Sequence, residues 1–66
     1  MARMERIKSF EVRHYDDSGA TVAYCDWVDD KGFPGRTEGE PYNSHMIALA
    51  QRAEREGLKV QFTHWL

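Results

Sequence analysis

The sequence has only one cysteine, only two prolines and no long apolar run in 66 residues. The lone Cys25 cannot form an internal disulfide, which excludes a disulfide-stabilised secreted scaffold. No segment has the apolar length of a signal peptide or a membrane span. These absences predict a cytoplasmic protein that does not associate with membranes.

Catalytic and cofactor motifs are also missing. The chain has no Gly-x-Ser-x-Gly elbow, no phosphate-binding loop and no dinucleotide fingerprint. The acidic run 26–32 lacks the alternating carboxylates and closing Glu of a calcium loop. His14 and His64 fall on neighbouring predicted strands, where Cys25 or His45 would have to complete a zinc site, but no paired ligand spacing supports one. We therefore expect no enzyme, no cofactor and no metal, and expect Cys25 to be a small buried hydrophobe.

The composition is that of a small globular protein, with 41% hydrophobic and 30% charged residues. We expect a single domain over residues 1–66, in which nearly every large apolar side chain is needed for the core. Residues 6–15 and 20–28 alternate as strands do, and Asp16–Gly19 between them is a turn signal. Pairing Tyr15 with Ala20 predicts a hairpin in which Phe10 faces Cys25 and Lys8 faces Trp27.

A helix is predicted over residues 44–56. Asn43 is a good N-cap, Gly57 suits the position after the helix, and apolar residues recur at helical spacing between them. Residues 58–65 alternate again and predict a third strand, with Val60 and Phe62 inward and Trp65 outward. A strand–helix–strand crossover would make this strand parallel to the second. We thus expect an α+β fold, ββαβ, with a three-stranded sheet in the order 2-1-3 and one helix on one face; the alternative places the third strand beside the second.

Residues 29–42 hold three glycines and both prolines, which predicts a long loop. The stretch 15–40 that includes most of it carries seven acidic and two basic side chains. Aromatic residues and arginine dominate protein interfaces, and acidic groups steer a protein toward a basic partner. We therefore predict partner binding by the open sheet face and by the loop. The predicted residues are Arg13, Tyr24 and Trp65 on the face, and Asp29, Asp30, Phe33, Arg36, Glu38, Glu40 and Tyr42 in the loop.

The preferred hypothesis is a non-catalytic interaction module, an inhibitor or accessory factor that binds a larger protein. A protein that itself binds nucleic acid is one such partner. Small acidic proteins without catalytic motifs are typical of phage or mobile-element products that block a host enzyme, such as anti-CRISPR or polymerase-inhibitor proteins. This is an analogy of class, since no family motif is present. One alternative is a single-stranded nucleic-acid-binding domain that uses Tyr24, Trp65 and Arg13. A second alternative is a homodimer that buries the bare face against its twin.

Overall fold

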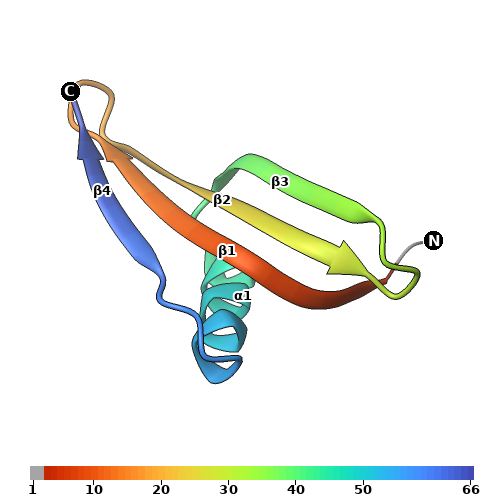
Figure 1. Cartoon of the computed structure of the whole chain (residues 1–66). Coiled ribbons are helices and arrows are strands. Elements are labelled where there is room, and N and C mark those ends of the chain that lie inside the picture. The colour runs from red at the N-terminus through yellow and green to blue at the C-terminus, as the bar shows by residue number, and fades with distance from the viewer. Residues whose placement is uncertain (1–2) are drawn as a thin grey trace.

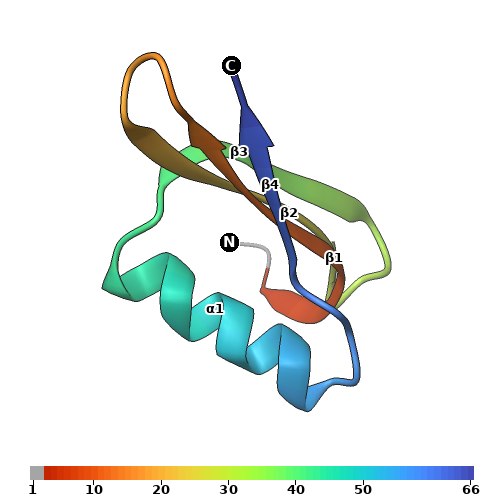
Figure 2. The ribbon, with the colours of Figure 1, turned by 90° about the vertical axis from the view of Figure 1, so that its left-hand side faces the viewer.

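The fold is α+β, with one helix on one face of a four-stranded mixed sheet (Figures 1 and 2). The computed structural model describes residues 3–66. The elements are β1 (Met4–Tyr15), β2 (Ala20–Asp29), β3 (Pro34–Pro41), α1 (Ser44–Arg55) and β4 (Gln61–Trp65). The sheet order is β3-β2-β1-β4. The predicted class with one helix on a sheet is confirmed, but the prediction of three strands is wrong.

The first two strands form the predicted hairpin, and the predicted register is confirmed for the residues close to the turn. Tyr15 pairs with Ala20 and Phe10 with Cys25, and Gly19 at φ 75° closes the turn. Further along, Trp27 pairs with Ile7 and not with Lys8, because the register shifts between Ile7 and Ser9. This bulge allows Ile7 and Phe10, three residues apart, both to be buried on the same face.

The prediction of a long loop over residues 29–42 is wrong for most of this segment, because β3 occupies Pro34–Pro41 and pairs antiparallel with β2. Its two prolines stand at the first and last positions of an edge strand, where a missing N–H is tolerated. Gly39 has φ 65° at a shift in register between Ala23 and Cys25. Residues that usually break a strand are therefore accommodated at its ends and at a bulge.

The helix agrees with its prediction to within one residue at its C-terminal end. The Asn43 side chain accepts hydrogen bonds from the backbone N–H groups of His45 and Met46. At the other end Gly57 has φ 88°, and Leu58 N–H donates to the carbonyl of Ala53 at 3.0 Å. This is the Schellman arrangement, which turns the chain from α1 toward β4.

Strand β4 pairs parallel with β1, so that β2, β1 and β4 are neighbours in the predicted order. The expected parallel relation to the second strand is wrong. The missed β3 reverses the chain direction once more before the helix, so the crossover joins β3 and β4. The strand is also shorter than predicted and begins at Gln61.

The core lies between α1 and one face of the sheet. It consists of Ile7, Phe10, Val12, Ala23, Cys25, Met46, Ala50, Ala53 and Val60. Cys25 is buried, as predicted, with 1% of its surface exposed, and burial raises the pKa of its thiol to about 11. Phe62 was predicted to point into the core but is 66% exposed; its ring meets that of Tyr42 edge to face. Within residues 3–66 no helix has both the length and the apolar character needed to cross a membrane.

Candidate binding surface

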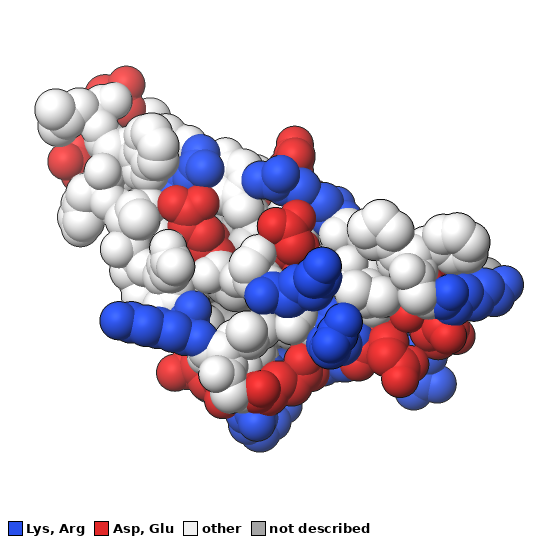
Figure 3. All heavy atoms as spheres, viewed as in Figure 1, with Lys and Arg blue, Asp and Glu red and all other residues white. Residues whose placement is uncertain are grey.

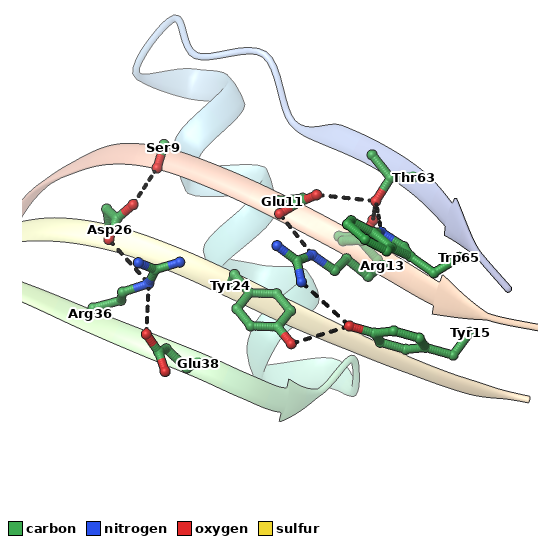
Figure 4. A network of polar contacts seen from close by, with 11 residues as sticks. Ser9, Glu11, Arg13, Tyr15, Tyr24, Asp26, Arg36, Glu38, Thr63 and Trp65 are labelled. Atoms are coloured by element: carbon green, nitrogen blue, oxygen red, sulfur yellow. Dashed lines mark hydrogen bonds and ion pairs between the residues drawn. The ribbon is translucent and has the colours of Figure 1, made fainter. Parts of the chain in front are cut away.

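The face of the sheet opposite α1 carries a layer of paired polar and aromatic side chains (Figure 4). Alternation along the strands brings them there, since the residues between core positions point the other way. Arg13 lies at the centre of one part of this layer. Its Cζ is 4.2 Å from the centroid of the Tyr24 ring and 4.6 Å from that of the Trp65 ring. We call Arg13, Tyr24 and Trp65 the stacked triad.

Hydrogen bonds fix the position of the triad. Arg13 Nε donates to Glu11 Oε1 at 3.0 Å, and Thr63 Oγ1 donates to the other oxygen of Glu11 at 3.1 Å. Trp65 Nε1 donates to Thr63 Oγ1 at 2.9 Å. The chain of contacts thus links the guanidinium of Arg13 to the indole of Trp65 through two side chains. Arg13 is held both by its aromatic neighbours and by a carboxylate.

Tyr15 completes this part of the face. Its hydroxyl is 3.5 Å from the hydroxyl of Tyr24 and accepts a hydrogen bond from Arg13 at 3.4 Å. The bond from Tyr24, with that from Arg13, lowers the pKa of Tyr15, whereas the same contact raises the pKa of Tyr24. The hydrogen bond to Tyr15 and the nearby Glu11 raise the pKa of Arg13. Arg13 therefore keeps its positive charge throughout the physiological range.

Tyr15, Glu11 and Thr63 were not among the predicted binding residues, although the predicted strand patterns already place Glu11 and Thr63 on the open face. The same alternation along β1 that places Arg13 and Glu11 on this face would also have identified Tyr15. The contact of Thr63 with Glu11 depended on the register of β4 against β1, in which Thr63 pairs with Arg13. That register could not be obtained from alternation alone.

A second polar cluster continues the layer across β2 and β3. Arg36 Nε lies 3.6 Å from Asp26 and 3.1 Å from Glu38, and Ser9 donates to Asp26 at 2.9 Å. Two of the predicted binding residues, Arg36 and Glu38, thus belong to the same face as the triad. They come from a strand and not from a loop.

Asp29 is one predicted binding residue that the structure gives another role. It is only 7% exposed, and its Oδ1 accepts the backbone N–H groups of Lys31 at 2.9 Å and Phe33 at 2.8 Å. The carboxylate closes the turn between β2 and β3, an Asx-type arrangement. Asp29 therefore has no exposed acidic group to offer a partner.

The other predicted residues are dispersed. Asp30 and the 64% exposed Phe33 lie in the turn between β2 and β3. Glu40 lines a hollow of about 370 Å³ on the side of the helix, together with Trp27. Tyr42 is half-buried beside Phe62. The predicted acidic loop is thus not one surface, and the open face is where the predicted residues converge.

His14 and His64 do lie together, with ring centroids 5.5 Å apart, and Asp16 is within 3.6 Å of both. Cys25 is enclosed in the core and does not join them. Among residues 3–66, no group of three histidine, cysteine or acidic side chains has the geometry to hold a metal ion. The pair instead connects the ends of β1 and β4.

No protein-family model, curated protein sequence or solved structure matches this chain. Its function is therefore inferred from the surface itself.

Proposed function

We propose that the chain is a non-catalytic interaction module that binds a larger protein through the open face of its sheet. The stacked triad carries this proposal. Arginine, tryptophan and tyrosine are the residue types that contribute most to interface hot spots. Here Arg13 already lies over both rings, and each of the three side chains is hydrogen-bonded to a neighbouring side chain. Side chains that are already ordered lose little conformational entropy on binding.

The charges on this face favour a protein over a nucleic acid. The face carries the carboxylates of Glu11, Asp26 and Glu38 and the guanidinium groups of Arg13 and Arg36. Acidic and basic side chains alternate across this side of the molecule (Figure 3). Nucleic-acid affinity depends on neutralising phosphates with unpaired basic groups. Both arginines already have carboxylate partners, and Arg13 covers one side of each aromatic ring on which a base would stack.

Inhibition of a host enzyme remains part of the proposal, with a cytoplasmic location. Acidic mimicry of phosphates is restricted to the exposed carboxylates, because Asp29 is occupied by backbone N–H groups. Glu38 is the predicted acidic residue that shares the face with the triad. The acidic contribution is therefore expected to come from β3, beside the aromatic centre.

Affinity capture with matched variants tests the proposal. Trp65→Ala removes one wall of the triad, and Ile47→Ala is its control, since Ile47 is 39% exposed, against 42% for Trp65, and lies on α1. A protein retained by the wild type and by Ile47→Ala is expected to bind Trp65→Ala roughly 30-fold more weakly, the loss typical of a hot spot. Retention should survive nuclease treatment. Equal retention by both variants would contradict the proposal, and retention that nuclease abolishes would favour the nucleic-acid alternative.

A further inference from the structure

The two edges of the sheet are built differently. The outer edge of β3 begins and ends with proline, is interrupted by the bulge at Gly39, and carries charges at Arg36, Glu38 and Glu40. Prolines, bulges and charges are the devices by which proteins prevent an edge strand from pairing with another chain. This edge is therefore protected.

The outer edge of β4 has none of these devices. Gln61–Trp65 contains no proline, no glycine and no acidic or basic residue other than His64. Figure 1 shows β4 beside β1, with no further strand on its other side. Its Phe62 is 66% exposed and Trp65 is 42% exposed. An exposed edge of this kind is a template for strand addition.

The hydrogen bonds to β1 identify which groups of this edge are free. Asp16 N–H donates to the carbonyl of Trp65 at 2.8 Å, so Trp65 presents its backbone groups to β1. In a parallel pair alternate residues face the neighbouring strand. Gln61 and Thr63 therefore also face β1. Phe62 and His64 direct their N–H and C=O groups to the free edge.

From this geometry we infer that β4 pairs antiparallel with β4 of a second copy of this chain, about a two-fold axis beside Thr63. In this register Phe62 of each copy lies opposite His64 of the other. Residues opposite each other in such a pair exchange both backbone hydrogen bonds. Four bonds then form, and they satisfy the free groups of Phe62 and His64 in both copies. Thr63 lies opposite its own counterpart, and the two sheets become one.

The same two-fold rotation brings opposite charges around the edge together. The exposed Lys59 precedes one end of β4, and the acidic turn with Asp16 and Asp17 lies beside the other end. Antiparallel pairing brings the start of one β4 next to the end of the other. Lys59 of each copy therefore approaches the acidic turn of its neighbour, and no like charges meet within the strands. This self-complementarity is the reason for choosing a second copy as the occupant.

The inference is independent of the proposed function, because pairing uses the edge of the sheet and leaves the open face accessible. It also differs from the homodimer that the sequence offered as a second alternative, which would bury that face. In the pair, the open faces of both copies lie on the same side of a continuous sheet.

Sedimentation over a range of protein concentrations tests the pairing. The matched variants are Phe62→Lys on β4 and Phe33→Lys in the β2–β3 turn, since the two phenylalanines are 66% and 64% exposed. We expect the wild type and Phe33→Lys to show a concentration-dependent monomer–dimer equilibrium. Phe62→Lys should weaken it roughly tenfold or more, because the change affects two symmetric cross-strand pairs. A wild type that stays monomeric at millimolar concentration, or a Phe62→Lys variant that dimerises equally well, would overturn the inference.

A cysteine cross-link tests the register. Residues opposite each other without mutual hydrogen bonds lie about 4.5 Å apart at Cα, which suits a disulfide. Thr63→Cys should form a covalent dimer under mild oxidation, whereas Thr37→Cys on β3 should not. Cys25 will not interfere, because its thiol is buried. Failure of Thr63→Cys to cross-link faster than Thr37→Cys would exclude this register.

Discussion

The two faces of the sheet place the same strands in different environments. On the face under α1, Phe10, Val12 and Ala23 pack against Met46 and Ala50 with almost no polar atoms. On the open face the neighbouring positions hold ion pairs, hydroxyls and stacked rings that satisfy one another at the surface. Burial stabilises the first face, whereas exposed ion pairs contribute little to folding. The comparison implies that stability and recognition can be altered separately.

Phe10→Ala should have the largest effect on folding. Phe10 is 2% exposed in the centre of the core, and removing a buried phenylalanine ring costs about 3 to 5 kcal/mol. In so small a protein this loss approaches the whole free energy of unfolding. Denaturant titration followed by circular dichroism measures it. A loss below about 1 kcal/mol would mean that the core is not where burial places it.

Gly35→Ala should come next, because Gly35 pairs with Trp27 across β2 and β3. A Cβ at this position would overlap atoms of the Trp27 indole ring. Overpacking of this kind costs roughly 1 to 3 kcal/mol. The same change made in a Trp27→Ala background should cost much less, since the ring it collides with is gone. A double-mutant cycle in denaturant that showed simple additivity would argue against this contact.

Glu56→Gln should have a smaller, pH-dependent effect. Glu56 accepts the Ile7 N–H at 3.0 Å and Arg52 Nε at 2.7 Å, and these bonds, that of Ile7 first, lower its pKa. A carboxyl group whose pKa is lower in the folded state stabilises the protein at pH values above its unfolded-state pKa. This stabilisation is lost as the pH falls through the folded-state pKa. At pH 7 the loss should be about 1 kcal/mol. It should disappear at a pH well below 4, where Glu56 is protonated in both states.

Unfolding free energies measured from pH 7 to pH 2 check this. Glu54→Gln is the control, because Glu54 is an exposed glutamate near the same end of the helix. Its effect should stay within about 0.5 kcal/mol, as for most surface changes. Equal effects of the two substitutions would show that Glu56 does not connect α1 to β1.

The helix and the first hairpin could be predicted because their signals are local. Asn43 and Gly57 mark the ends of α1, and the turn before Ala20 sets the register nearby. Strand β3 could not be predicted in this way, since its prolines and glycines are unfavourable except at an edge, and pairing with β2 makes that edge. The bulge after Ile7 likewise depends on tertiary packing.

The candidate surface was predictable to the extent that alternation decides which side chains lie on it. Arg13, Tyr24 and Trp65 could be assigned to one face from the sequence, whereas their contacts required the order of the strands. Asp29 could not be assigned correctly from the sequence, because composition does not distinguish an exposed carboxylate from one that closes a turn. The exposure of Phe62 could not be predicted either, since the helix does not cover the part of β4 where Phe62 lies. The partner role of the triad stays a prediction.

The central claim is that the open face serves recognition and not folding. The most direct test is to measure, on one preparation of Trp65→Ala, both the free energy of unfolding and the affinity for the captured protein. The account predicts unfolding within about 1 kcal/mol of the wild type, as for an exposed residue, together with a roughly 30-fold loss of affinity. Unchanged affinity, or a loss of affinity that only accompanies unfolding, would contradict it.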